Sequence, residues 1–239
     1  MITIAAASSR GAAYGLSTLA QLLRFDTTLR SHVVDFVPLS ISDHPRFSWR
    51  GFMVDTSRHY IPVDDLLAMI DGMYAARLSH FHWHVVDSPS FPLQSAAHPE
   101  LAQAGSWSGT NASIYTLEQQ RAIALRCKQR FIELVIEVDT PAHTLAVAKA
   151  HPDYMSQCWE WMATSRYKVD VDSDDCLAMN PTKQAARDMV ATLLHEVADI
   201  ASTSSTEFVH IGGDEVKFDC WKADPQIAAH VTKMYGDTS

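Results

Sequence analysis

Hydrophobic and polar positions follow a regular order over residues 46–239. Short, nearly continuous apolar runs predict four strands, at 51–55, 80–86, 131–138 and 207–211. Apolar residues at helical spacing predict four helices, at 63–77, 116–130, 183–201 and 225–235. Apolar strands that alternate with helices are typical of a parallel sheet that is buried on both faces. We therefore expect an α/β fold in which helices connect parallel strands.

The N-terminal part of the chain has a different pattern and is expected to belong to another unit. Leucines at helical spacing predict an amphipathic helix over 11–25, and a short strand is predicted over 33–37. The N-terminus is apolar but lacks the basic region of a signal peptide, so it is interpreted as an internal segment. A boundary near Pro45 follows, which separates residues 1–45 from residues 46–239.

Each predicted strand ends in or leads to ionisable residues: Asp55 to Arg58 at the first, Asp87 at the second, Glu137 and Asp139 at the third, and Asp214 with Glu215 at the fourth. A TIM barrel assembles its active site at the C-terminal ends of successive strands, so this placement favours a barrel over an open sheet. Four strands make half of an eight-stranded barrel. The predicted fold is therefore the N-terminal half of a TIM (β/α)8 barrel, with strands 1–4 in residues 46–239.

Composition excludes two classes of function. The chain is 47% hydrophobic and 20% charged, which suits a globular protein with a large core. Its 19 basic and 28 acidic residues give a formal net charge of −9 and form no basic patch, so nucleic acid is not an expected partner. No run of about 18 apolar residues is present, so we expect no membrane span.

The segment at 210–215 combines two glycines with two adjacent carboxylates. Gly212 and Gly213 permit unusual backbone angles and close approach of a ligand, and Asp214 and Glu215 follow them. Two carboxylates in one cleft suit general-acid and charge-stabilising roles when one is kept protonated and the other ionised. The other interpretation is a solvated acidic pair at a loop entrance. The preceding apolar strand favours a catalytic role.

Histidines alternate along the second strand, where His80, His82 and His84 share one face. A His-x-His pair can bind zinc, so a metal-dependent TIM-barrel hydrolase that uses His82 and His84 is an alternative function. A row of hydrogen-bonded histidines in a polar barrel interior is the other interpretation. Asp87 and Asp139 could add metal ligands or contact a sugar.

Two further loops carry candidate binding groups. Asp139 and His143 lie four residues apart after the third strand, and a carboxylate beside an imidazole orients the ring and shifts its pKa. Arg58, after the first strand, offers a rigid donor that suits vicinal hydroxyls or a carboxylate. A structural salt bridge is the alternative role of this arginine.

Five segments, in this order, resemble the β-N-acetylhexosaminidases of glycoside hydrolase family 20, particularly the lysosomal hexosaminidase subunits. They are RG with DTSRHY at 50–60, FHWHVVD with PSFP at 81–92, EVDTPAHT at 137–144, HIGGDEV at 210–216 and CWK at 220–222. The resemblance implies removal of terminal non-reducing β-linked N-acetylhexosamine by a retaining mechanism in which the substrate's own 2-acetamido group attacks the anomeric carbon. Neither a metal nor another cofactor is implied.

The resemblance also implies a role for each candidate residue. Glu215 matches the general acid and base, and Asp214 matches the residue that stabilises the oxazolinium intermediate. The substrate-binding residues matched are Arg58, which holds the 3- and 4-hydroxyls, the coupled pair Asp87 and His143, and Asp139. Residues 1–45 match the end of an α+β N-terminal non-catalytic domain.

The resemblance also implies a disulfide, and with it an oxidising compartment. Cys158 and Cys220 match a disulfide of the family, whereas Cys127 and Cys176 have no counterpart in it. Asn111 begins a sequon in a polar stretch. The resemblance therefore implies a lysosomal or secreted protein.

The implied substrates are β-linked N-acetylhexosamine glycans of glycoproteins and glycolipids, and chitooligosaccharides. A dimer is expected for the full-length protein. The second half of the family's barrel supplies Trp and Tyr side chains around the sugar, so this chain alone is expected to be weakly active or inactive, with open sheet edges. If the chain is complete, a non-catalytic glycan-binding half-barrel is a third possibility.

Overall fold

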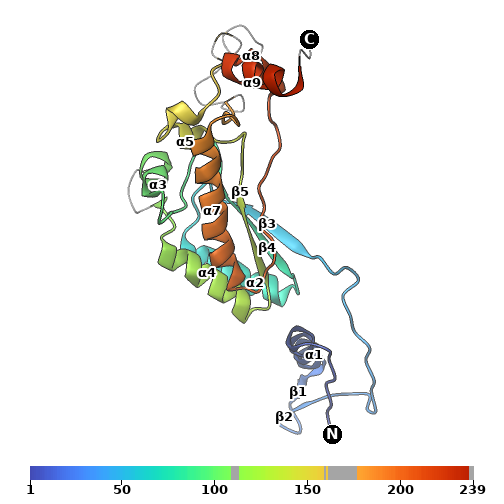
Figure 1. Cartoon of the computed structure of the whole chain (residues 1–239). Helices are drawn as coiled ribbons and strands as arrows, with labels where there is room; N and C mark the ends of the chain where they lie inside the picture. The colour runs from blue at the N-terminus through green and yellow to red at the C-terminus, as the bar shows by residue number, and fades with distance from the viewer. Residues whose placement is uncertain (109–112, 159, 161–176, 237–239) are drawn as a thin grey trace. The chain divides into compact units, whose positions relative to one another are not determined.

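The computed structural model describes residues 1–108, 113–158, 160 and 177–236. The chain divides into two compact units, Met1–Arg50 and Gly51–Ser239 (Figure 1). No helix in the described ranges is long and apolar enough to cross a membrane.

The N-terminal unit contains one helix and one hairpin: α1 (Ser9–Leu22), β1 (Arg24–Asp26) and β2 (Ser31–Val33). The predicted helix is present but ends earlier than expected, because β1 begins at Arg24. The strand predicted over 33–37 is wrong, since β2 ends at Val33. The carboxylate of Asp26 accepts the backbone N–H groups of Thr28 and Leu29, each at 2.9 Å, and so closes the turn of this hairpin. The strand therefore forms at residues 31–33, next to the turn, and not at the predicted residues 33–37.

The larger unit is built on a parallel sheet of three strands: β3 (Gly51–Asp55), β4 (His80–Val86) and β5 (Glu133–Val138). β4 is central, and Trp83 pairs with Val54 of β3 and with Ile136 of β5. These strands confirm three of the four predicted. β5 starts later than predicted because Phe131 has a positive φ of 56°, and the N–H of Ile132 closes the preceding helix by donating to Cys127 at 2.9 Å.

Helices and loops follow the strands in the predicted order. The long helices are α2 (Val63–Ala75), α4 (Leu117–Gln129) and α7 (Gln184–Ser202). α4 packs against α2 and α7, and both α4 and α7 pack against β5 (Figure 1). The short elements are α3 (Pro99–Gly105), α5 (Leu145–Ala148), the 3-10 helix η2 (Pro152–Tyr154), α8 (Phe218–Ala223) and α9 (Pro225–Tyr235). Apart from α9, these short elements were not predicted, because they are too brief to show an apolar period.

Side chains of β4 alternate as the sequence predicts. Phe81, Trp83 and Val85 are completely buried in one core with residues of α2, α4 and α7. Histidines occupy the alternate positions, and the side chain of His82 is 25% exposed. One face of the sheet is therefore apolar and covered by helices, while the other carries polar groups.

The predicted fourth strand, 207–211, is wrong as a regular strand. A single parallel bridge joins His210 to Glu137, with hydrogen bonds of 3.1 Å from the N–H of His210 to Ile136 and from the N–H of Val138 to His210. The segment therefore lies beside β5, where a fourth parallel strand belongs. Within the described residues it pairs on one side only, and its apolar side chains are exposed.

Candidate active site

Asp87 is the central acceptor of the site. It follows β4, is buried, and its Oδ2 atom lies 2.7 Å from Nε2 of His84 and 2.8 Å from Nη1 of Arg58. Its other oxygen lies 3.2 Å from Nδ1 of His143 and accepts the backbone N–H of Ser88 at 2.6 Å. Burial opposes ionisation, but the hydrogen bonds from His143, His84 and Ser88 outweigh it and lower the pKa of Asp87.

His143 connects Asp87 to the adjacent carboxylates. The residue is buried and adopts a left-handed backbone with φ 57°. Its Nε2 atom lies 3.3 Å from Oε2 of Glu215 and 3.6 Å from Oδ1 of Asp214, and it makes no hydrogen bond within the described part of the chain. The hydrogen bond to Asp87 raises the pKa of His143 to about 9, against the effect of burial. A protonated imidazole therefore faces both candidate catalytic carboxylates.

The two carboxylates stand at the surface on a loop with unusual backbone angles. The side chains of Asp214 and Glu215 are 72% and 52% exposed. Gly212, Gly213 and Glu215 all have positive φ, of 63°, 102° and 54°. Such angles are costly for a residue with a Cβ, so Glu215 adopts a strained conformation of the kind that clusters at functional sites.

Asp139 anchors this loop. Its Oδ1 atom accepts the backbone N–H of Gly213 at 3.0 Å. A Cβ built on Gly212 would lie 1.7 Å from the same oxygen, so only glycine permits this approach. Burial raises the pKa of Asp139 to about 6, although the hydrogen bond from Gly213 acts in the opposite direction. Asp139 thus fixes the backbone of the residue that directly precedes Asp214 and Glu215.

Arg58 extends the site toward β3. Its Nη1 atom lies 2.8 Å from Oδ2 of Asp55, and the other oxygen of Asp55 accepts the N–H groups of Ser57 and Arg58 at 2.9 and 3.0 Å. The side chain of Arg58 is 44% exposed, so its guanidinium is fixed by carboxylates and still open to solvent. Such a group can bind hydroxyls of a ligand.

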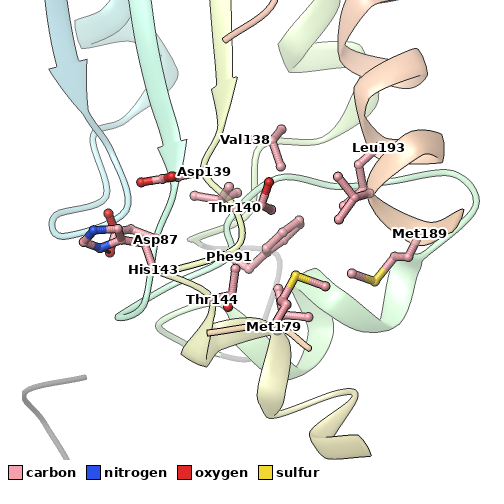
Figure 2. A pocket seen from close by; sticks show the side chains of 13 residues that line it. Asp87, Phe91, Val138, Asp139, Thr140, His143, Thr144, Met179, Met189 and Leu193 are labelled. Carbon is pink, nitrogen blue, oxygen red and sulfur yellow. Dashed lines mark hydrogen bonds and ion pairs between the residues drawn. The ribbon is translucent and has the colours of Figure 1, made fainter. Parts of the chain in front are cut away.

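The structure thus brings together all six predicted site residues, which are Arg58, Asp87, Asp139, His143, Asp214 and Glu215. An apolar pocket lined by Phe91, Met179 and Leu193 lies beside Asp87 and His143 (Figure 2). The polar groups therefore stand at the edge of a packed core, which holds them in place.

Sequence reasoning missed the part played by Glu137. This buried residue of β5 contacts His82 and lies 2.9 Å from Nδ1 of His84 and 3.2 Å from Nδ1 of His210. Burial opposes its ionisation, but these histidines outweigh burial and lower the pKa of Glu137. The signal was present in the sequence, because an acidic residue interrupts the apolar run of a buried strand.

His84 joins Glu137 to Asp87. Burial lowers its pKa, but hydrogen bonds to Asp87 and Glu137 raise it, with a net value of about 10. The histidines of β4 therefore form a charged network with buried carboxylates, which matches the interpretation of a polar interior.

Donor groups suited to a metal also occur here. One combines His82 with Glu137 and His210, and another combines His84 with Glu137 and Asp139. Within the described ranges no such group contains both His82 and His84, so the pair proposed for the metal-dependent alternative is not brought together in one set of ligands.

Cys158 and Cys220 form a disulfide, as the resemblance implied. Cys127 is buried and free, and burial raises the pKa of its thiol to about 12. Asn111 and Cys176 lie outside the described residues.

Residues 47–238 match the family model "Glycosyl hydrolase family 20, catalytic domain". Among curated relatives, the human β-hexosaminidase subunit β is 36% identical over 217 residues, and the Arabidopsis thaliana β-hexosaminidase 3 is 35% identical over 232 residues. These alignments cover 91% and 95% of this chain but only 36% and 39% of the relatives.

This chain is also similar to solved structures. A chitobiase of Flavobacterium johnsoniae is 32% identical with a TM-score of 0.75, and the match covers 95% of this chain and 32% of that one. An exo β-N-acetylglucosaminidase of Vibrio harveyi is 27% identical with a TM-score of 0.77, over 98% of this chain and 37% of that one.

Proposed function

The chain belongs to glycosyl hydrolase family 20, and we propose that it supplies the catalytic carboxylates for removing terminal non-reducing β-linked N-acetylhexosamine from glycoconjugates. The observation that carries this proposal is the position of His143. It bonds to the buried Asp87 on one side and faces Asp214 and Glu215 on the other. One charged ring thus orders two exposed carboxylates at the end of a parallel sheet.

In the proposed reaction the substrate provides the nucleophile. The oxygen of the 2-acetamido group bonds to the anomeric carbon while the bond from that carbon to the glycosidic oxygen breaks. Glu215 donates its proton to the leaving oxygen, and then accepts a proton from the water that opens the cyclic intermediate. Configuration at the anomeric carbon is retained, because two successive displacements each invert it.

Asp214 accepts a hydrogen bond from the acetamido N–H in this mechanism. Its negative charge offsets the positive charge that develops on the ring of the intermediate. The protonated His143 lies 3.3 Å from Oε2 of Glu215 and 3.6 Å from Oδ1 of Asp214, so it places a positive charge beside both carboxylates. Asp87 holds His143 in that protonated state.

Arg58 is proposed to bind the sugar. Its guanidinium is oriented by Asp55 and Asp87 and is partly exposed, so it can approach the 3- and 4-hydroxyls of a terminal sugar. Asp139 supports the site through Gly213 and does not need to touch the substrate.

We infer that β3, β4, β5 and the segment at 207–211 are the first four strands of a TIM barrel. Their parallel order and the placement of the polar residues at the C-terminal ends support this inference. Residues 1–45 are proposed to be the end of an N-terminal non-catalytic domain. The chain spans about two fifths of its curated relatives, and the remaining strands would complete the sugar pocket.

The proposed substrates are glycans of glycoproteins and glycolipids, and chitooligosaccharides. A lysosomal or secreted location is proposed, supported by the disulfide between Cys158 and Cys220, which persists in oxidising compartments. We also propose a dimer for the full-length protein, from the resemblance alone.

The test compares β-glycosides that differ only at carbon 2. The protein that contains this chain should release a chromogenic aglycone from β-GlcNAc or β-GalNAc glycosides, but not from the β-glucoside, which lacks the acetamido nucleophile. Treatment with EDTA should leave the rate unchanged. Comparable turnover of the β-glucoside would contradict substrate assistance. A metal ion bound through His82 and His84, together with a rate abolished by EDTA, would favour the metal-dependent alternative.

A further inference from the structure

A second group of metal-binding side chains lies away from the carboxylates of the candidate active site. His98, Glu100 and His151 place three ligand atoms within 4.8 Å of one another. Nδ1 of His98 and Nε2 of His151 lie 3.1 Å and 3.0 Å from the same oxygen, Oε1 of Glu100. We propose that these three residues bind a divalent transition-metal ion, with zinc as the expected metal.

The donor set suits zinc. Two imidazoles and one carboxylate form a common set of three protein ligands, and the fourth position of a tetrahedral site is left to water. Bonds of about 2.0–2.1 Å to a tetrahedral ion separate two ligand atoms by about 3.3 Å. The two separations from Glu100 are therefore short of the required geometry by only a few tenths of an ångström, which small side-chain rotations supply.

The ligands are ordered and also accessible. The backbone N–H of His98 donates to Oγ of Ser95 at 2.9 Å, and the ring of His151 stacks on Tyr154 with centroids 4.5 Å apart. The side chains of His98, Glu100 and His151 are 24%, 41% and 23% exposed. An ion can thus enter from solvent and meet a site that is already assembled.

Such a site would join two of the loops that frame the candidate active site. His98 and Glu100 lie at the start of α3, in the connection after β4, whereas His151 follows α5, in the connection after β5. α3 and α5 pack closely, because a Cβ on Gly105 would lie 3.0 Å from the carbonyl oxygen of Ala146. A bound ion would therefore act as a crosslink between the two loops and stabilise their arrangement.

The two donor groups that contain Glu137 compete less well for this role. Glu137, which is common to two of them, already contacts His82, His84 and His210. Within the described ranges the carboxylate of Glu100 forms ion pairs with the two histidines of the proposed site alone, and both would become ligands.

Zinc binding to the whole chain tests the proposal. After treatment with EDTA and its removal, zinc is titrated at pH 7.5 in competition with a chromogenic chelator. We expect one site per chain, with affinity at least about tenfold weaker in each of His98→Gln, Glu100→Gln and His151→Gln. His230→Gln, on exposed α9, is the matched control and should leave the affinity unchanged. Cobalt should give the visible absorption of a tetrahedral site only where His98 and His151 are present.

Circular dichroism establishes that each variant is folded. The readout is metal binding, so it does not depend on the proposed glycosidase activity. Absence of zinc binding by the unaltered chain would overturn the proposal. So would a site that survives both His98→Gln and His151→Gln, or one that is lost in His210→Gln and retained in those two variants.

Discussion

Nδ1 of His143 lies 3.2 Å from Oδ1 of Asp87, and both side chains are buried below two exposed carboxylates. The second oxygen of Asp87 is shared by His84 and Arg58. One buried carboxylate therefore receives groups from the ends of β3 and β4 and from the loop after β5. Its negative charge offsets the positive charges of His143, His84 and Arg58.

Replacing Asp87 with Asn should lower both the stability of the fold and the pKa of His143. The amide keeps the shape of the side chain but removes the charge that three cationic groups face. We expect the free energy of unfolding to fall by about 3 kcal/mol, measured by urea unfolding, because one partner of a buried charged network is lost. The pKa of His143, measured by NMR, should fall from about 9 toward the ordinary value of about 6.5.

Asp71→Asn provides the matched control. Asp71 also bonds to two cationic groups, Nη1 of Arg126 at 2.7 Å and Nε of Arg130 at 2.8 Å, but its side chain is 41% exposed. Ion pairs exposed to this extent contribute little to stability, so Asp71→Asn should cost much less than Asp87→Asn. Equal losses in the two variants would show that burial of Asp87 is not what makes its charge important.

Stability should fall as the pH rises above neutrality. His84 and His143 have pKa values raised to about 10 and about 9 in the folded chain, so they hold protons that an unfolded histidine releases near pH 6.5. Their contribution is complete below about pH 6.5 and is lost as the pH rises through 9–10. We expect the free energy of unfolding to drop by about 2 kcal/mol or more between pH 6.5 and pH 9.5.

The variant His143→Gln separates this effect from other titrations in the same range. Urea unfolding at pH 6.5, 8.0 and 9.5 should give a smaller pH dependence than in the unaltered chain, with part of the slope retained because His84 remains. Parallel curves for the two proteins would show that His143 does not hold an additional proton in the folded state.

The sequence predicts the site better than it predicts the irregular parts of the fold. Strands β3 and β4 match their predicted bounds, because both are short apolar runs and β3 pairs along its whole length with β4. The apolar pattern of residues 207–211 predicts a strand, but the segment is irregular. Regular pairing depends on neighbouring strands, which the pattern of the segment itself does not specify. The network around Glu137 depends on register between strands, which also lies beyond a local pattern.

Gly212→Ala should displace the loop that carries the carboxylates. A Cβ at this position would lie 1.7 Å from Oδ1 and 2.9 Å from the backbone Cα of Asp139, and the φ of 63° is unfavourable for alanine. We expect a loss of about 1–3 kcal/mol in the free energy of unfolding, together with loss of glycosidase activity. Gly72→Ala is the control.

Gly72 lies inside α2, and a Cβ there meets no atom within 4 Å. Alanine should therefore stabilise the helix by up to about 1 kcal/mol and leave activity unchanged. If Gly212→Ala behaved like Gly72→Ala, the close approach to Asp139 would not be a constraint on the loop.

Reduction of the disulfide should destabilise the chain. The bond between Cys158 and Cys220 closes a loop with a sequence separation of 62, which restricts the unfolded state. We expect dithiothreitol to lower the free energy of unfolding by about 2–4 kcal/mol. The double variant Cys158→Ala, Cys220→Ala should show the same loss without reductant and no further loss with it. Cys127→Ser, which removes the free buried thiol, should remain sensitive to reduction.

Glu215→Gln and Asp214→Asn should impair the proposed reaction in different ways. Glutamine cannot protonate the leaving oxygen, so Glu215→Gln should lower kcat/KM by about 10²–10⁴ for a GlcNAc disaccharide, whose leaving group is basic. The loss should be much smaller for a 4-nitrophenyl glycoside, since a stable phenolate leaves without a proton. Asp214→Asn removes the charge opposite the developing cation, which every substrate forms, so its losses on the two substrates should be similar.

Both side chains are more than half exposed, so urea unfolding should show little change for either variant. Equal dependence on the leaving group in the two variants would refute the separate roles of Glu215 and Asp214.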